Sequence, residues 1–337
     1  MTDDAGSKTP QVFVMGRVCA DLYPLQYEVP LEDVKTFEKF VGGFAGNVAT
    51  GLARLNVRAA IISGIGDDGH GRFVRRFLAA EGVNVTWLRT HPTLRTALAF
   101  CEVWPPDRFP ITFYRTPTCP DWELRREDLP LDSLPAASLL YVTGTGLARD
   151  PSRSTTIAAM ERRRAGRTAP SRPGAGPWLP ATILDLDWRE VLWNRVADYA
   201  REIATAARLA DILVGGAGEF AAAGLDPASA FDLGPRLVVV KGGPDGATVM
   251  DGARVHHVPG LPVVVTNGLG AGDAFAAAFG AGLIGGLEPL SAVARGNAAG
   301  AIVATRLSCS TAMSRPWEID ALLAGAHVVD GVVVPGS

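Results

Sequence analysis

The stretch Asn267-Gly268-Leu269-Gly270-Ala271-Gly272-Asp273-Ala274-Phe275 runs from a glycine-rich turn into a helix rich in alanine and glycine. Glycine lets a backbone turn tightly and approach a ligand closely. The free N–H groups and positive dipole end of a helix start suit a phosphate, or the charge on a phosphoryl group in transfer. Asp273 stands beside those amides, where a carboxylate can take the proton of an attacking hydroxyl. An Asp that merely caps an ordinary helix is the competing interpretation, and this stretch alone does not separate the two.

Upstream of this stretch, short apolar runs alternate with segments of helical pattern, which predicts a parallel sheet with ligands at the carboxyl ends of its strands. The predicted strands are residues 11–15, 58–63, 138–144, 181–187, 210–216 and 236–243. Two strand-like runs within 95–118 have no helix between them and predict a small antiparallel flap. Residues 161–180, rich in Arg, Pro and Gly, predict a flexible surface insertion, with a basic docking element as the alternative.

The composition limits the classes of function. The chain has 337 residues, 47% of them hydrophobic and 20% charged, which is enough for a sizeable core. A net charge of -3 gives no electrostatic case for nucleic acid or an anionic membrane. The four cysteines lack CxxC spacing, so we expect reduced thiols rather than zinc ligands or disulfides. The N-terminus lacks the pattern of a signal peptide and no long apolar run occurs, so we expect a cytoplasmic protein without a membrane span.

Two further glycine-rich segments carry polar residues. Gly42-Gly43-Phe44-Ala45-Gly46-Asn47 leads into a predicted helix, and the Asn47 amide can both donate to and accept from sugar hydroxyls. Asp21 follows the first strand and can accept from two hydroxyls, although a helix cap and a surface turn explain these two residues equally simply. Lys241-Gly242-Gly243-Pro244-Asp245-Gly246 ends a β-branched strand, where the turn either passes under a nucleotide or forms a plain hairpin.

Other phosphate-binding patterns are weak or absent. Residues 64–69 match GxGxxG, but no acidic residue ends the next predicted strand, where a dinucleotide site needs a partner for the ribose. No Gly-Lys-Ser/Thr occurs, which excludes a P-loop kinase, and the five histidines have no metal-ligand spacing.

Together these residues resemble the ribokinase-like carbohydrate kinases, also called the PfkB family. Gly42–Asn47 with Gly64–Asp68 is similar to the first signature of that family, and Gly270–Phe275 is similar to the second, in the same order. The resemblance covers nearly the whole chain. It implies a single domain over residues 1–337 with a three-layer α/β/α fold, a mainly parallel central sheet, and a small β lid formed by about 16–40 and 95–118 that closes to exclude water.

A longer set of segments is similar to one subgroup of that family, the kinases of 5-dehydro-2-deoxygluconate in myo-inositol catabolism. These segments are Gly16-Arg17, Asp21–Pro24, Pro105–Pro110, Phe113–Arg115, Asp185–Arg189, Asn267–Gly270 and Asn297–Gly300. The similarity implies that ATP with Mg²⁺ phosphorylates the terminal 6-hydroxyl of that sugar acid.

The resemblance also implies a role for each site residue. Asp273 is the base, and the amides of Gly270, Ala271 and Gly272 stabilise the phosphoryl group in transfer. Glu219 is associated with magnesium through water. The residues implied to hold substrate hydroxyls are Asp21, Gly43 and Asn47, and those implied to line the nucleotide are Lys241, Gly243, Gly246, Asn267 and Asn297.

The chain departs from the family pattern at three positions. Asn267 replaces an Asp near the phosphates, which puts a monovalent-cation site in doubt. Gly216 stands where many relatives carry the Asn of Asn-x-x-Glu, and Asp187 stands where sugar-acid kinases often carry Asn. The first two changes bear on the cation sites and leave Glu219 in place.

An acidic substrate calls for a cation that binds its carboxylate. A planar guanidinium binds a carboxylate through two parallel hydrogen bonds. Arg17, Arg115 and Arg189 each lie in a segment predicted to face the cleft, and we expect one or two of them to serve, the others being surface ion-pair partners.

Three alternatives remain at this stage. The chain could be another kinase of the family, acting on 2-keto-3-deoxygluconate or fructose, because few contacts decide the substrate. It could be a non-catalytic protein that binds a sugar or a nucleotide, because a fold does not fix a function. An NAD-dependent dehydrogenase is the third, weakened by the missing ribose partner. A homodimer is expected by analogy with the family.

Overall fold

The computed structural model describes residues 9–166, 177–252 and 254–335, and its centre is a nine-stranded sheet. The strands of this main sheet are parallel except in the pairs β11–β12 and β12–β13. Across the sheet they follow the order β13 (Arg254–Pro259), β12 (Gly246–Asp251), β11 (Leu237–Lys241), β10 (Ile212–Gly216), β9 (Ala181–Asp185), β8 (Leu139–Thr143), β1 (Val12–Met15), β4 (Ala59–Gly66) and β5 (Leu88–His91).

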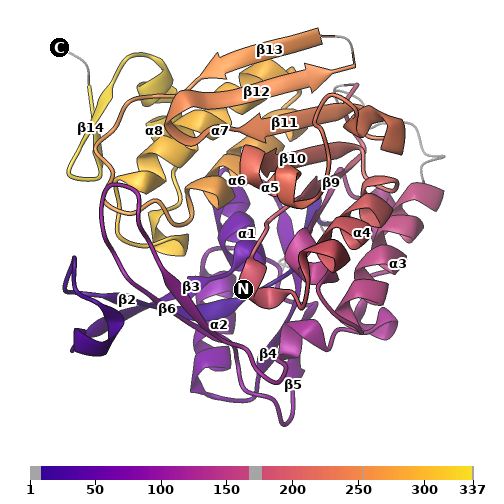
Figure 1. Cartoon of the computed structure of the whole chain (residues 1–337), viewed down its shortest axis with the longest axis horizontal. Helices are drawn as coiled ribbons and strands as arrows, with labels where there is room; N and C mark the ends of the chain where they lie inside the picture. Colours follow the sequence, from indigo (N-terminus) through magenta and orange to yellow (C-terminus); the bar gives the residue numbers. More distant parts are fainter. Residues whose placement is uncertain (1–8, 167–176, 253, 336–337) are drawn as a thin grey trace, which may run out of the picture.

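Helices cover both faces of the main sheet, which gives three layers (Figure 1). Parallel strands covered on both faces need apolar residues in succession, and all four residues of β1 are buried. One face carries α1 (Phe44–Arg54), α2 (Gly69–Ala80), α6 (Ala271–Ile284) and α7 (Pro289–Ala304). The other carries α3 (Ser152–Ala165), α4 (Val196–Ala207) and α5 (Ala217–Ala222). This architecture confirms the predicted α/β/α fold.

The chain ends in a small unit beside α7. Helix α8 (Pro316–Leu323) packs on α7, and the hairpin of β14 (His327–Val329) and β15 (Val332–Val334) follows it. Within the ranges that the structure describes, every helix is too short or too polar to cross a membrane.

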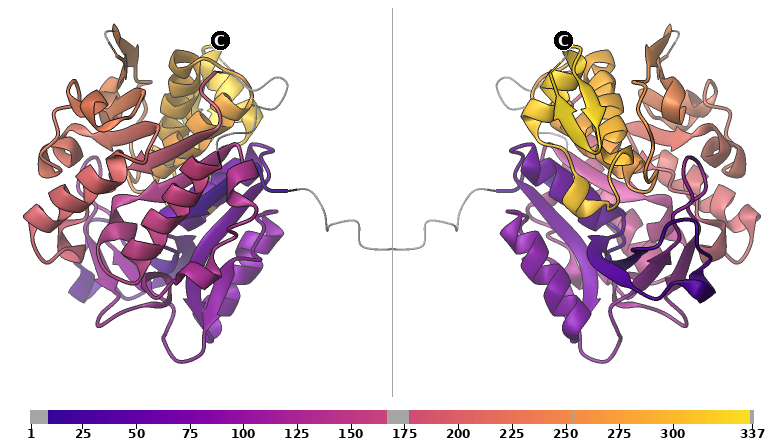
Figure 2. Two further views of the ribbon diagram at one scale, coloured as in Figure 1. Left: turned by 90° about the vertical axis from the view of Figure 1, so that its right-hand side faces the viewer. Right: turned by 90° about the vertical axis from the view of Figure 1, so that its left-hand side faces the viewer.

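A second sheet of four strands lies beside the main sheet, below the C-terminal helices drawn in yellow (Figure 2). Its strand order is β3 (Phe37–Gly42), β2 (Cys19–Pro24), β6 (Leu98–Cys101) and β7 (Ile111–Tyr114). These strands come from the two segments in which the sequence predicted a lid. The pair β2–β6 is parallel, so the small sheet is mixed rather than purely antiparallel.

The predicted insertion at 161–180 is wrong at its first residues. Helix α3 continues to Ala165, and the Arg163 side chain is buried. Its guanidinium donates to the carbonyl oxygens of Leu134, Pro135 and Ser138. An arginine can be buried when its N–H groups find acceptors, which composition alone does not reveal. The middle of the insertion, residues 167–176, lies outside the described residues.

Candidate active site

Two pockets meet at the first turn of α6, on the side where the parallel strands of the main sheet end. Gly270 and Asp273 line the smaller pocket, with a volume of about 50 Å³, whereas Ala271 and Gly272 line the larger one, of about 610 Å³. Gly270 precedes the helix with φ +82°, the left-handed conformation that favours glycine. The amides at the helix start therefore stand between two cavities.

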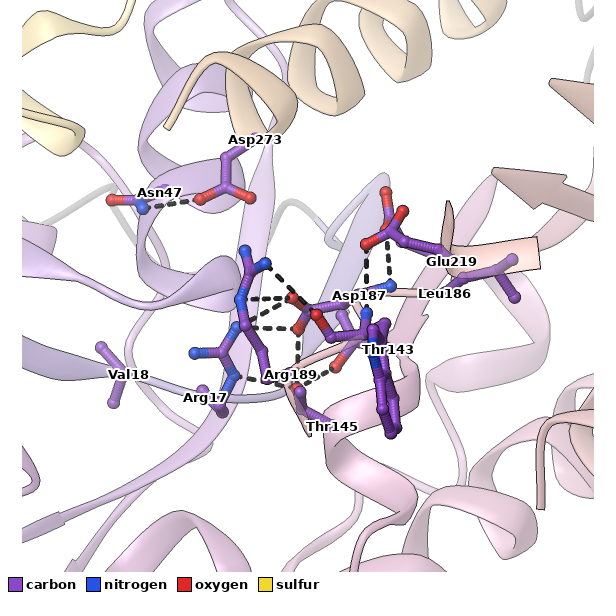
Figure 3. Close-up of polar contacts among 12 residues, drawn as sticks. Arg17, Val18, Asn47, Thr143, Thr145, Leu186, Asp187, Arg189, Glu219 and Asp273 are labelled. Carbon is purple, nitrogen blue, oxygen red and sulfur yellow. Dashed lines mark hydrogen bonds and ion pairs between the residues drawn. The ribbon is translucent and has the colours of Figure 1, made fainter. Parts of the chain in front are cut away.

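Asp273 turns its carboxylate toward the smaller pocket (Figure 3). Asn47 Nδ2 donates to Asp273 Oδ2 over 2.7 Å, while no partner for the buried Asn47 Oδ1 is found among the described residues. Burial raises the pKa of Asp273 to about 6, although the Asn47 hydrogen bond favours the charged form. At neutral pH the carboxylate is ionised and can accept a proton.

Asp21, on β2, is a second buried carboxylate of the smaller pocket. Burial raises its pKa to about 6, and the Cys19 thiol donates to it over 3.0 Å. A Cβ on Gly42 would lie 1.8 Å from Asp21 Oδ2, so only glycine leaves room for this carboxylate. The first glycine-rich segment thus makes space for Asp21, and Gly43 and Asn47 of that segment line the same pocket.

Two arginines face one carboxylate at the edge of the smaller pocket (Figure 3). The buried Arg17 guanidinium contacts Asp187 over 2.7 Å and donates to Thr145 Oγ1 over 2.9 Å. Arg189 Nε lies 3.5 Å from Asp187 Oδ1, and this side chain is 43% exposed. Burial by itself raises the pKa of Asp187, but the arginines hold it below its usual value. Two positive groups against one negative group leave positive charge at this edge of the pocket, whereas Asp21 and Asp273 supply the negative charge elsewhere in it.

Arg115 does not line either pocket, which corrects the expectation of a direct substrate contact. Its buried guanidinium donates to Asp121 Oδ1 over 2.6 Å and lies 4.4 Å from the centre of the Trp122 ring. The other oxygen of Asp121 accepts the backbone N–H of Val18 over 3.2 Å. Arg115 therefore supports the entry into β2 from behind the pocket.

A charged cluster joins the ends of β9, β10 and β11 beside the larger pocket. Lys241 Nζ lies 3.1 Å from Asp185 Oδ2 and 3.8 Å from Glu219 Oε2. Burial raises the pKa of Asp185, while the Lys241 ammonium opposes that change. In the sequence, Asp185 lies in the predicted strand 181–187 and in the segment Asp185–Arg189 that is similar to the subgroup, but neither pattern predicts a role for it in the site.

The donor set of this cluster fits a divalent cation held through water. Both Glu219 oxygens accept backbone N–H groups, from Gly216 over 2.6 Å and from Trp188 over 3.0 Å. This use of both oxygens leaves Glu219 suited to an indirect, water-mediated contact rather than to direct ligation. Two carboxylates against one ammonium give the cluster a net negative charge, which favours a hard cation.

The larger pocket is built from backbone and apolar side chains. The turn Gly242–Gly246 joins the antiparallel strands β11 and β12, so it forms a hairpin, and Lys241, Gly243 and Gly246 also line the pocket. Asn297 of α7 lines the opposite wall and donates to the carbonyl oxygens of Val258 and Pro259 over 3.1 and 3.0 Å. The apolar lining consists of Leu261, Pro262, Val263, Val265, Phe275, Ala301 and Ala304. Such a slot suits an aromatic base, with its phosphates toward Gly272 and Lys241.

Asn267 is fully buried and lines neither pocket, which corrects its expected contact with a nucleotide. Its Nδ2 donates to the Leu307 carbonyl over 2.5 Å, and its Oδ1 accepts from the Leu269 amide over 3.0 Å. Both ends of the side chain thus fix the glycine-rich turn before α6.

Comparison with known proteins finds a family model and relatives that match most of this chain. A model of the pfkB family of carbohydrate kinases matches residues 9–316. The chain is 32% identical over 326 residues to a 5-dehydro-2-deoxygluconokinase of Clostridium tetani, covering 93% of this chain and 92% of that protein. It is 30% identical over 326 residues to a 5-dehydro-2-deoxygluconokinase of Bacillus subtilis, covering 94% and 96%.

Solved structures lead to the same family. A fructokinase of Vibrio cholerae, bound to fructose, ADP and calcium, superposes with a TM-score of 0.80 at 26% identity, covering 94% of this chain and 99% of that one. An aminoimidazole riboside kinase of Salmonella enterica superposes with a TM-score of 0.76 at 25% identity, covering 93% and 99%. The family predicted from the two glycine-rich signatures is confirmed, and this chain belongs to the pfkB family of carbohydrate kinases.

Proposed function

We propose that this kinase transfers the γ-phosphoryl group of ATP to the terminal 6-hydroxyl of 5-dehydro-2-deoxy-D-gluconate. The observation that carries the proposal is the position of the α6 start between two pockets, with the partly buried Asp273 carboxylate on the smaller side and Arg17 and Arg189 at the edge of that side. The two curated relatives described above carry the name of this activity, at 32% and 30% identity.

In the proposed reaction the sugar occupies the smaller pocket and its primary hydroxyl approaches Asp273. The carboxylate accepts the hydroxyl proton while the oxygen attacks the γ-phosphorus in line, and the bond from that phosphorus to the β,γ-bridging oxygen breaks to release ADP. The amides of Gly270, Ala271 and Gly272 stabilise the negative charge of the phosphoryl oxygens in transfer, because they lie at the helix start, where the Ala271 amide makes only a long contact of 3.4 Å with the Gly268 carbonyl.

The remaining residues of the smaller pocket orient the sugar acid. Asp21 and Asn47 exchange hydrogen bonds with its hydroxyls, and Gly43 admits the sugar close to the backbone. Arg189, half exposed beside Asp187, binds the carboxylate of the substrate. Arg17 is already bound to Asp187 and Thr145, so it supplies positive charge and fixes the position of Asp187.

The larger pocket takes ATP. The base lies in the apolar slot near Asn297, and the phosphates lie at Gly272 and Lys241 over the turn of Gly243 and Gly246. The charge of a bound magnesium ion would offset the negative charge of the phosphate oxygens. Glu219 and Asp185 would hold it through water, and we assign no site to a monovalent cation, although one relative of known structure was solved with potassium.

An ADP-release assay with Mg-ATP tests the proposal. The substrates are 5-dehydro-2-deoxygluconate, 2-keto-3-deoxygluconate, fructose and ribose, and NMR of the product locates the phosphate. We expect kcat/KM for the first substrate to exceed the others by at least about tenfold, the scale of one good polar contact. Preference for another sugar would overturn the proposed substrate but retain the kinase activity. No turnover of any of the four sugars would contradict the proposed function.

We also propose that the enzyme works as a homodimer in the cytoplasm, as one domain whose small sheet acts as a lid. The outer face of that sheet carries a row of three aromatic side chains. The ring centre of Phe100 lies 5.3 Å from the ring centres of both Phe37 and Tyr114, and Tyr114 is 59% exposed. This row suits contact with a second copy. Light scattering should give the dimer mass, and Tyr114→Glu should lower it to the monomer; a monomeric wild-type protein would contradict the proposal.

A further inference from the structure

The hairpin of β6 and β7 is one continuous ladder that extends beyond the small sheet. Leu98 pairs with Tyr114 at its base, and the pairing continues to Cys101 and Ile111. Beyond the strands, Glu102 donates to Pro110 over 2.9 Å, and Trp104 and Arg108 exchange two backbone hydrogen bonds of 3.0 and 3.1 Å. The loop after β6 rises from the small sheet toward the C-terminal part of the chain (Figure 1). These bonds join residues 98–114 into one continuous hairpin, which we call the lever.

This lever touches both pockets. Its base lines the smaller pocket through Ala99, Cys101, Ile111 and Phe113. Its tip lines the larger pocket through Pro106 and Asp107. The two ends of one rigid element therefore lie against the two ligands that must meet for phosphoryl transfer.

Phe109 lies between the base and the tip, where the lever rests on the turn before α6. Side chains alternate along an antiparallel ladder, so Phe109 follows Ile111 and Phe113 on the inner face. A Cβ built on Gly268 would lie 2.9 Å from Phe109 Cε2, which means that the ring sits directly against the Gly268 backbone. Phe109 also packs in one apolar cluster with Cys101, Ile111 and Leu269.

We propose that Phe109 is a positioning residue that couples the two substrates, so that each binds more tightly when the other is present. A ligand in either pocket fixes the same lever against Gly268, and the second ligand meets a lever that is already ordered. Gly268 has no side chain at the contact, which allows the ring this close approach. The inference rests on the proposed assignment of the pockets to sugar and nucleotide.

Calorimetry on the full-length enzyme measures the coupling. The probes are a non-hydrolysable ATP analogue with Mg²⁺ and 5-dehydro-2-deoxygluconate, each titrated with and without the other. If the activity assay selects another sugar of the panel, that sugar replaces 5-dehydro-2-deoxygluconate as the calorimetric probe. A wrong substrate assignment can then be distinguished from an absence of coupling. We expect each Kd to fall about 5- to 20-fold in the presence of the partner, by equal factors, within the usual range of coupling between sites.

Three variants assign the effect to Phe109. Phe109→Ala should bring the coupling factor close to one while the Kd of the ATP analogue alone changes less than about threefold, because Phe109 lines neither pocket. Phe109→Tyr retains the ring and should retain the coupling, and Thr112→Ala, on the outer face of the same hairpin, is the matched control. Independent binding in the wild type, or full coupling in Phe109→Ala, would overturn the proposal.

Discussion

The two pockets on either side of the α6 start, called the smaller and the larger side, are lined by different kinds of groups. On the smaller side, charged and polar side chains that are mostly buried define the pocket, among them Asp21, Asn47 and Asp273. On the larger side, glycine-rich backbone and apolar side chains form most of the lining. Both sides share the same helix start, but only on the smaller side do individual charged and polar side chains form most of the expected ligand contacts.

This difference predicts where substitutions matter. A buried charge that loses its partner is costly, because the remaining group is neither solvated nor paired. A slot made of backbone and apolar surface distributes its contacts over many atoms, so that one side chain contributes little. The smaller side should therefore be sensitive to single substitutions and the larger side tolerant of them.

The largest effect is expected at Asp273. Asp273→Asn keeps the shape of the side chain but removes the group that accepts the proton, so kcat should fall by about 10² to 10⁴-fold. Steady-state kinetics measures the fall, and calorimetry with the ATP analogue should give an unchanged Kd. Near-normal turnover in this variant would refute the role of the base.

Arg189 should give the next effect, limited to acidic substrates. Arg189→Lys retains the charge but loses the planar fork, so KM for the sugar acid should rise about 10- to 100-fold, while KM for ATP and for any neutral sugar changes little. Arg195→Lys is the control, since Arg195 is also exposed and also pairs with a carboxylate, that of Asp198. An equal rise of KM for neutral and acidic sugars would contradict the carboxylate contact.

A smaller effect concerns pH. The pKa of Asp273 is raised to about 6 by burial, so its base form disappears as pH falls through that value, and kcat/KM should decline below pH 6. Asp21 has its pKa raised to about 6 by the same cause, which steepens the decline. The Asn47 hydrogen bond favours the charged form, and Asn47→Leu should therefore move the acidic limb to higher pH. A limb that stays in place or moves to lower pH would disagree with this electrostatic description.

The smallest effect is expected on the nucleotide side. Asn297→Ala removes two hydrogen bonds to carbonyl oxygens in the pocket wall and should raise KM for ATP by no more than about fivefold, the scale of a single net hydrogen bond. Arg295→Ala, on the same helix but paired with Asp320, serves as control. A loss of two orders of magnitude in kcat/KM would show that the two sides are not as different as their construction indicates.

The sequence predicted the site where its signals are local. Gly270 and Asp273 are near neighbours, as are Gly43 and Asn47, so each pair of residues proposed to meet a ligand could be recognised within one segment. The parallel sheet followed in the same way from alternating strand and helix patterns, whereas the three-layer α/β/α arrangement was implied by the family resemblance. What had to be inferred from the family was the assembly of these segments around one cleft.

The pairing of polar side chains around the site could not be predicted. The Arg115 guanidinium was expected to be free to bind the substrate. It forms an ion pair with Asp121 instead, and Asp121 lies in a short turn that no periodic sequence pattern marks. The pairing of Lys241 with Asp185 joins two strands that are 56 residues apart. Asn267 stands where the family pattern has an Asp near the phosphates, yet its partners are backbone groups of Leu269 and Leu307. Local sequence patterns do not identify these partners, whether they lie a few residues away, as Asp121 and Leu269 do, or far away, as Asp185 and Leu307 do.

A crystal structure with the Mg-bound ATP analogue and 5-dehydro-2-deoxygluconate tests the central claim most directly. The account predicts the sugar acid in the smaller pocket, its primary hydroxyl about 2.6–3.2 Å from the Asp273 carboxylate and its own carboxylate at Arg189, with the γ-phosphate at the amides of Ala271 and Gly272. A sugar bound with its carboxylate toward Asp273, or a nucleotide whose phosphates lie away from the α6 start, would contradict it.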